Sequence, residues 1–177
     1  AVSANFAFLQ EHDPVFLQLA STAEQVFASD PNTTLIKLRQ LGEALAQDLA
    51  SRAGIEFDNT TSQADLLYKL SREIQLDQNI RNLFHILRVE GNKATHQFRT
   101  RHREAMDGLK VARDLAIWFH QCFGKSTSSF KPGAFVTPSD PSTPLRDLHQ
   151  QIDQLKAQLS DSCQQLESNQ QLAQLLK

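Results

Sequence analysis

The chain has 177 residues, of which 40% are hydrophobic, and a formal net charge of -2 at pH 7. This length suffices for one domain with a full core, because a domain of this size buries about 70% of the surface that its unfolded chain exposes. The nearly balanced charge excludes a protein that coats nucleic acid over its whole surface, so any contact with DNA must come from a local patch.

The two cysteines, Cys122 and Cys163, lie far apart in different predicted segments. They do not form a disulfide framework, which indicates a reducing cytoplasm. No apolar stretch approaches the roughly 20 residues of a membrane span, and the first residues lack the basic and apolar regions of a signal peptide. Because the chain begins without Met and ends inside a helical pattern, we expect it to be part of a longer protein.

Two helices are predicted in the first third of the chain. Asp-Pro pairs at positions 13 and 30 are start signals, because Asp can cap a helix and Pro suits its first position. The first helix runs to about Ser29, and the second stops at Gly54. Each has one apolar face, which predicts burial in a core. These faces consist of Phe16, Leu17, Ala20, Ala23 and Phe27 in the first helix, and of Leu35, Leu38, Leu41, Leu45 and Leu49 in the second.

Three further helices are predicted before residue 125. A short one begins after Ser62, which reads as its cap, and a longer one begins after Asp77. The apolar pattern of this fourth helix ends at Leu87. A fifth helix runs from about Glu104 to Gly124. Their apolar faces consist of Leu66, Leu67 and Leu70, then Ile80, Leu83, Phe84 and Leu87, then Leu109, Ala112, Ala116, Phe119 and Phe123.

The expected organisation has three parts. Residues 1–124 form an all-α bundle, because nothing between residues 10 and 124 alternates like a strand. Residues 125–143 are rich in Ser, Thr, Pro and Gly and form a linker or strap, with Phe130 and Phe135 pinned to the bundle. Residues 144–177 form a long amphipathic helix.

The last helix carries a heptad seam that is typical of a coiled coil. Its seam positions, spaced by three and four, are Leu145, Leu148, Ile152, Leu155, Leu159, Ser162, Leu166, Asn169, Ala173 and Leu176. We expect the seam to pack on a helix of another chain or of a second copy. The alternative is a lone amphipathic helix that folds back on the bundle.

Two apparent motifs do not predict sites. Gly124-Lys-Ser126 lacks the earlier glycine of a phosphate loop, since Phe119 stands there in a helix. His120 and Cys122 are two residues apart and face different sides of their helix, so no zinc-binding spacing is found in the chain. No metal site is therefore predicted.

The central stretch, residues 88–96, places polar groups between two apolar helices. Such a stretch serves either as a site or as a polar clasp that locks the helices together. As a clasp, Gly91 would end the fourth helix, where positive φ carries no steric penalty, and Asn92 would bond free backbone groups there. His96 can donate and accept hydrogen bonds, and its expected partner is Glu43 in an earlier helix.

A basic patch follows from Gly91 to Arg103 and contains no acid. Its cations are Lys93, Arg99, Arg101 and Arg103. Such a loop can contact phosphates of DNA. The alternatives are a solvated loop, or one that pairs with acids elsewhere in a larger parent protein.

Four short stretches occur in an order that is typical of one family. They read DPNTTLIKLR at 30–39, GEA at 42–44, FHILR at 84–88 and GNKATH at 91–96. In these the sequence resembles the helical domain at the N-terminus of many R (restriction) subunits of type I restriction-modification enzymes. That domain has no assigned function and is related to the HEPN superfamily. The resemblance covers roughly residues 5–124 and continues loosely into the Gln-rich helix.

The resemblance implies a HEPN-like helical bundle and a non-catalytic accessory domain. The parent protein would be a DNA translocase and endonuclease, with a nuclease domain and an ATP-driven motor elsewhere in its chain. The expected partners are the other domains of the R subunit, the modification and specificity subunits, and DNA. ATP and Mg²⁺ are expected for the parent, and no cofactor is expected for the present chain.

Two alternatives come from other classes. Nucleases of the HEPN superfamily carry an Arg and a following polar residue, then a His four to six positions later, and cleave RNA without metal. Here Asn92 and His96 match, but Gly91 stands in the place of the Arg, and Arg88 falls outside the usual spacing. A ribonuclease would therefore have to use His96 with Arg88 or Arg99. The other alternative is a stand-alone coiled-coil interaction protein.

Overall fold

The computed structural model describes residues 3–97, 100–138 and 142–176. It divides into two compact units, residues 1–138 and residues 139–177. All regular structure in the described residues is helical, which confirms the predicted all-α class. None of the helices described is long and apolar enough to cross a membrane.

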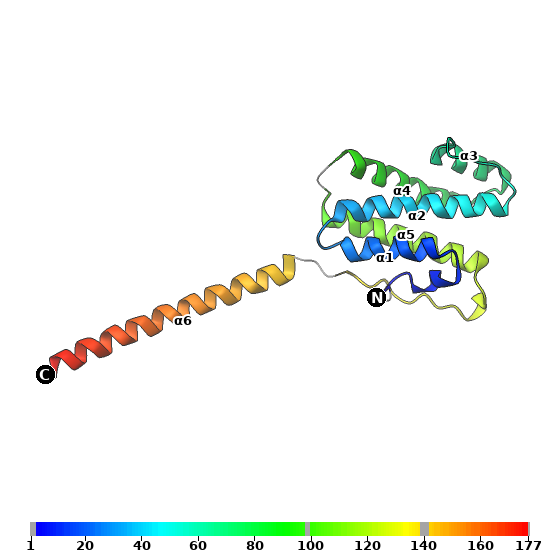
Figure 1. Cartoon of the computed structure of the whole chain (residues 1–177). Helices are drawn as coiled ribbons and strands as arrows, with labels where there is room; N and C mark the ends of the chain where they lie inside the picture. Colours follow the sequence, from blue (N-terminus) through cyan, green and yellow to red (C-terminus); the bar gives the residue numbers. More distant parts are fainter. Residues whose placement is uncertain (1–2, 98–99, 139–141, 177) are drawn as a thin grey trace. The chain divides into compact units, whose positions relative to one another are not determined.

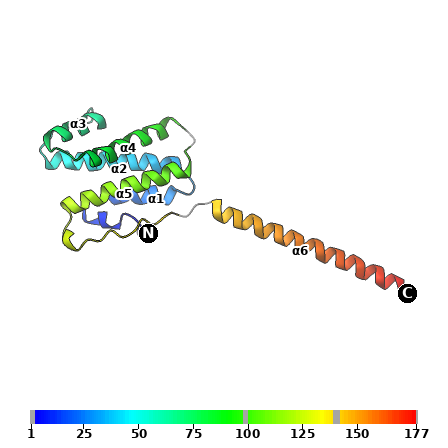
Figure 2. The same ribbon diagram turned by 180° about the vertical axis from the view of Figure 1, so that it is seen from behind.

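The described residues of the first unit form five α-helices and two short 3₁₀ helices. The α-helices are α1 (Pro14–Val26), α2 (Pro31–Arg52), α3 (Gln63–Glu73), α4 (Gln78–His96) and α5 (His102–Phe123). The 3₁₀ helices are η1 (Ala7–Glu11) and η2 (Thr127–Ser129). Figures 1 and 2 show α2, α4 and α5 side by side.

The helix starts follow the predicted caps at three positions. Asp13, Asp30 and Ser62 each accept a hydrogen bond from a backbone N–H of the first turn, over 3.0, 3.1 and 3.1 Å. These bonds satisfy donors that a helix start otherwise leaves free. Asp77 stands at the start of α4 as predicted, but its side chain makes no capping hydrogen bond to the described first turn.

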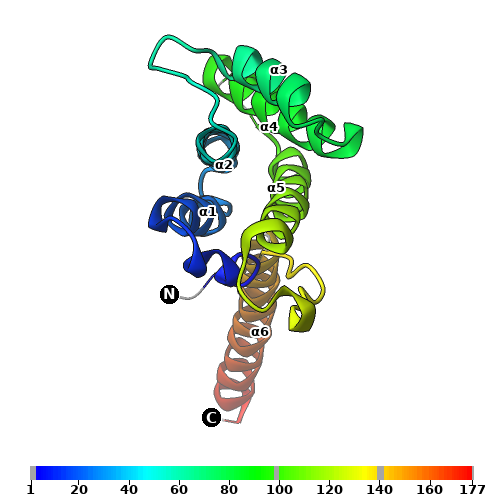
Figure 3. The same ribbon diagram turned by 90° about the vertical axis from the view of Figure 1, so that its right-hand side faces the viewer.

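Helix α2 is the centre of the bundle. It contacts α1, α3, α4 and α5, and Figure 3 shows it between α1 on one side and α3 and α4 on the other. Its predicted leucine stripe is buried, and Thr34, Gly42, Ala46 and Ala50 are buried beside it. An apolar helix that is covered on several sides needs such small residues, because they let neighbouring backbones approach closely.

The predicted end of the fourth helix is wrong. Helix α4 continues through Gly91 to His96, and Gly91 is not among the residues with positive φ. Gly91 and Ala94 are buried there. Packing against the bundle therefore outweighs the cost of about 1 kcal/mol that glycine carries inside a helix.

Residues 124–138 form a strap that packs on the bundle, and they belong to the same compact unit. The guanidinium of the buried Arg113 donates to the backbone carbonyls of Asn5, Pro132 and Gly133. The Asn5 side chain bonds both backbone groups of Val136. The strap is thus hydrogen-bonded to the N-terminal segment through its backbone.

The phenylalanines of the strap lie against the bundle, as predicted. Phe130 contacts the rings of Phe8 and His120, with centroids 5.2 and 4.5 Å apart. The ammonium nitrogen of Lys110 lies over the ring of Phe135, 5.8 Å from the centroid of that ring.

The second unit is one unbroken helix, α6 (Ser142–Leu175), as predicted (Figure 1). Its seam residues from Leu148 onward are exposed; Leu155 and Leu159 are 64% and 67% exposed. Such a row of exposed leucines is typical of a helix that packs on a partner helix.

Candidate functional site

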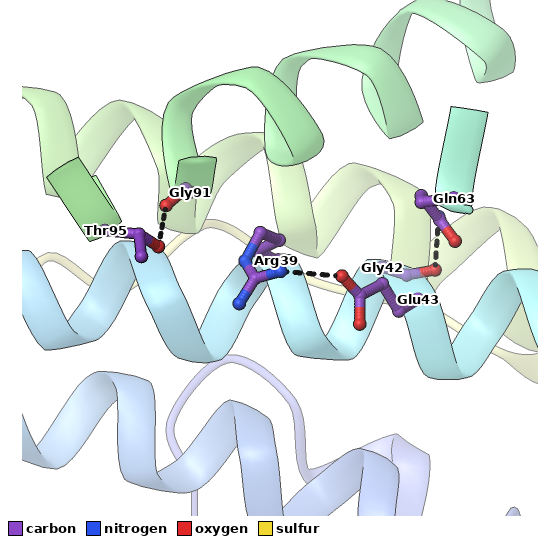
Figure 4. Close-up of polar contacts among 6 residues, drawn as sticks. All are labelled: Arg39, Gly42, Glu43, Gln63, Gly91 and Thr95. Carbon is purple, nitrogen blue, oxygen red and sulfur yellow. Dashed lines mark hydrogen bonds and ion pairs between the residues drawn. The ribbon is translucent and has the colours of Figure 1, made fainter. Parts of the chain in front are cut away.

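The central stretch lies on the C-terminal half of α4, where this helix crosses α2. Figure 4 shows Arg39 of α2 beside Gly91 of α4. A Cβ added at Gly91 would come within 2.9 Å of Cγ and Cδ of Arg39, and closer still to its Cβ. Only glycine therefore allows α4 to lie this close to α2 at this point.

Arg39 fills the crossing with its aliphatic stem and ends in an ion pair. Its Nη1 donates to Oε1 of Glu43, one turn later on α2, over 2.9 Å (Figure 4). Its Nε is buried and has no hydrogen-bond partner in the described residues. Arg39 thus buries its stem and keeps its charged end at the rim of the crossing.

The predicted clasp is corrected by this geometry. Glu43 pairs with Arg39 rather than with His96, while Asn92 and His96 are exposed on α4. Neither Asn92 nor His96 has a side-chain hydrogen bond to a described residue. The expectation depended on a helix end at Gly91, and α4 does not end there. Arg39 was missed, although its spacing of four from Glu43 is a signal that sequence offers.

Two further hydrogen bonds join side chains to backbone along this crossing. Thr95 donates through its hydroxyl to the carbonyl of Gly91 over 3.0 Å. The amide of Gln63, at the start of α3, donates to the carbonyl of Gly42 over 3.3 Å. Figure 4 shows both bonds beside the ion pair of Arg39 and Glu43.

The residues of the ribonuclease alternative share one row of α4 but do not converge. Arg88 and His96 are eight residues apart, which separates them by about 12 Å along the axis of a helix. The guanidinium of Arg88 instead lies 3.2 Å from Nδ1 of His85. One copy of the chain therefore does not bring Arg88 and His96 to the same phosphate group.

Of the predicted basic residues that the structure describes, one forms an ion pair and two are exposed without one. Lys93 pairs with Glu90, one turn earlier on α4, over 3.4 Å. Arg101 and Arg103 are exposed at the start of α5 and make no ion pair with a described residue. Arg99 lies outside the described residues.

The described residues on either side of the connection between α4 and α5 are hydrogen-bonded to the bundle. The Asn32 side chain donates to the carbonyl of Ala94 and accepts from the hydroxyl of Thr100. The ring of His102 lies 3.1 Å from the carbonyl of Ala28, to which its Nε2 can donate. Arg101 and Arg103 thus stand beside Thr100 and His102, whose side chains are held by hydrogen bonds. The positive end of the α5 dipole adds to their attraction for an anion.

A shallow groove of about 340 Å³ between α3 and α4 is a second basic surface, and sequence reasoning missed it. It is lined by Ala64, Leu67, Tyr68, Ser71, Gln78, Arg81, Asn82, His85 and Arg88, with no acid among them. Tyr68 is 63% exposed. The spacing of Arg81, His85 and Arg88 by four and three was the available signal, since it puts them on one face of α4.

Comparison with known proteins finds a family that matches much of the bundle. Residues 21–118, which include both α2 and α4, match the family described as Domain of unknown function (DUF4145). The type I restriction enzyme EcoKI endonuclease subunit of Escherichia coli (strain K12) is 35% identical over 156 residues. This match covers 88% of the present chain and 13% of that subunit. No solved structure matches the chain significantly.

Proposed function

The chain belongs to the family described as Domain of unknown function (DUF4145), and on this basis we propose that it is a non-catalytic accessory domain of a type I restriction endonuclease R subunit. The observation that carries the proposal is the extent of the match. The 35% identity covers 88% of the chain, more than the part that the family accounts for. Because the chain spans 13% of the length of that relative, DNA cleavage and ATP-driven translocation belong to the parent in this proposal, as do ATP and Mg²⁺.

The proposed role is to hold the parent in its complex. Arg101 and Arg103, which have no acidic partner in the described residues, are suited to DNA phosphates. The exposed seam of α6 is suited to a helix of the modification subunit, the specificity subunit or a second copy.

The proposal is tested by mixing the purified chain with the complex of modification and specificity subunits and with duplex DNA. Sedimentation should show the chain associated with the subunit complex. Incubation of the chain alone with RNA or DNA, with and without Mg²⁺ and ATP, should yield no cleavage products.

Two results would overturn the proposal. RNA cleavage that disappears in His96→Ala would establish the ribonuclease alternative. Failure of the chain to bind the subunits or DNA would remove the accessory role.

A further inference from the structure

Three side chains that can bind a metal converge where η1 meets the C-terminal end of α5. They are Glu11 and His12, adjacent in sequence, and His120. One ligand atom of each lies within 4.8 Å of the others. Nε2 of His12 lies 2.9 Å from Nδ1 of His120. The spacing of residues along the chain did not predict this cluster.

Aromatic rings hold the two histidines in place. His120 is 3% exposed and lies between Phe8 and Phe130, with ring centroids 5.3 and 4.5 Å away. His12 packs edge-on against Phe119 at 5.1 Å. Rings fixed in this way lose little freedom when they bind a ligand, which favours a preformed site.

The backbone after α5 completes the surroundings. The amide of Lys125 donates to Oε2 of Glu11 over 3.0 Å and leaves the other carboxylate oxygen available. A Cβ added at Gly124 would lie about 2.5 Å from the His120 ring, so the chain can turn over this ring only at a glycine. The carboxylate and the buried ring are thus positioned by the same short segment.

The surroundings of His12 combine partial burial with charges of both signs. Burial lowers the pKa of His12, and the charges of His120 and Arg52 lower it further, while Glu11 and Asp48 raise it. Arg52 is itself paired with Asp48, which offsets its positive charge toward an incoming cation.

We propose that Glu11, His12 and His120 form a binding site for one transition-metal dication. Two imidazoles and one carboxylate suit Zn²⁺, Ni²⁺ or Cu²⁺, whereas Mg²⁺ and Ca²⁺ prefer oxygen ligands throughout. The bound ion takes the place of the hydrogen bond between the rings, and the ring that donated this bond carries its proton on its other nitrogen instead, so that both rings bind as neutral imidazoles. Water fills the remaining positions from the side of Glu11, which is exposed.

The separation of the two nitrogens indicates which geometry needs least movement. With bonds of about 2.1 Å, two ligands at a right angle are about 3.0 Å apart, and two ligands of a tetrahedron about 3.4 Å apart. The observed 2.9 Å, an ordinary length for a hydrogen bond between two ring nitrogens, is closer to the right angle of Ni²⁺ or Cu²⁺. Zn²⁺ in a tetrahedral site would require the rings to separate by about half an ångström.

The site is tested by calorimetric titration of the untagged chain with NiCl₂ and with ZnCl₂. Wild type should bind one Ni²⁺ per chain. At free Ni²⁺ of 100 times the dissociation constant, its thermal midpoint should rise by roughly 5–10 °C. His12→Gln should lose this binding and the rise, and Glu11→Gln should weaken binding at least about tenfold. His149→Gln, which removes an exposed histidine of α6, should bind as wild type does.

Several outcomes would overturn the site. They are no Ni²⁺ or Zn²⁺ binding by wild type at millimolar metal, unchanged binding by His12→Gln, or binding lost equally in His149→Gln. If His12→Gln is unfolded without metal, Glu11→Gln decides the matter, because an exposed carboxylate is not required for folding. Unchanged affinity in that variant would then contradict the three-ligand site.

Discussion

At Gly91 the absence of a side chain decides how two helices meet. The same residue type has different consequences at Gly42, where an added Cβ would make an ordinary contact of 3.5 Å with Leu87. At Gly91 the obstruction is Arg39 close to its backbone, which cannot rotate away. The space around each glycine, rather than helix propensity, therefore decides whether a substitution there raises or lowers the stability of the chain.

Gly91→Ala should lower the free energy of unfolding by about 1–3 kcal/mol, because α2 and α4 must separate to admit the methyl group. Gly42→Ala is the matched control and should leave stability unchanged or raise it by up to about 1 kcal/mol. Urea unfolding followed by circular dichroism measures both. Equal effects of the two substitutions would show that the crossing is not tightly packed.

Asp30, which caps the start of α2, makes the stability of the folded chain depend on pH. Its hydrogen bonds from the side chain and backbone of Thr33 lower the pKa of its carboxyl group. The charged form is therefore favoured in the folded chain, and its contribution is fully present above the unfolded pKa of about 3.9. It is lost as the pH falls through the lower folded value.

Asp30→Ala should accordingly cost about 1 kcal/mol at pH 7 and less as the pH falls below about 4. Unfolding titrations of both proteins at pH 7, 5 and 3 measure the difference. A cost that stays constant over this range would mean that the charge of Asp30 does not contribute.

At the scale of elements, one side chain attaches the strap to α5. Arg113 is buried and donates to three backbone carbonyls, two of them in the strap. These carbonyls face the bundle and would lose their partner if the guanidinium were removed. The strap is therefore expected to open as a unit.

Arg113→Ala should destabilise the chain by about 2–4 kcal/mol and expose residues 125–138 to proteases. Limited proteolysis with mass spectrometry locates the cuts. Asp114→Ala, the exposed neighbour of Arg113 on α5, is the control and should leave the cutting pattern close to that of wild type.

The seam of α6 should drive association. Each buried leucine contributes about 1.5–3 kcal/mol, so charge on the seam should abolish self-association. Sedimentation of Leu155→Asp with Leu159→Asp should give a monomer, as should removal of residues 139–177. The control replaces Gln150 and Gln164, off the seam, by Asp and should associate as wild type does. A wild-type chain that is monomeric at high concentration contradicts this expectation.

At the scale of the whole molecule, the net charge is -2, so any attraction for DNA depends on how the positive side chains are distributed over the surface. The end of the bundle that carries Arg101 and Arg103 lies at the start of α5, and the groove with Arg81 and Arg88 lies between α3 and α4. Because the chain has no net positive charge, substitutions in one basic surface at a time can show which of the two binds DNA.

Replacing Arg99, Arg101 and Arg103 by Ala should weaken duplex binding and reduce its salt dependence. Contact with about three phosphates gives a slope of roughly -2.7 in log affinity against log salt for the wild type. Fluorescence anisotropy from 50 to 200 mM salt measures it. The matched control replaces Lys69, Arg72 and Arg81 by Ala, an equal loss of charge near the groove. A larger effect of the control would show that α3 and α4 bind the DNA instead.

The sequence by itself determined the helical class, the capped starts of α1, α2 and α3, the leucine stripe of α2 and the continuity of α6. These depend on neighbours within one turn, which spacing along the chain reveals. Only the tertiary structure decided that Gly91 lies inside α4 against Arg39, because a crossing of two helices depends on distant residues. It also brought His12 to His120, 108 residues away, where no local spacing relates the two.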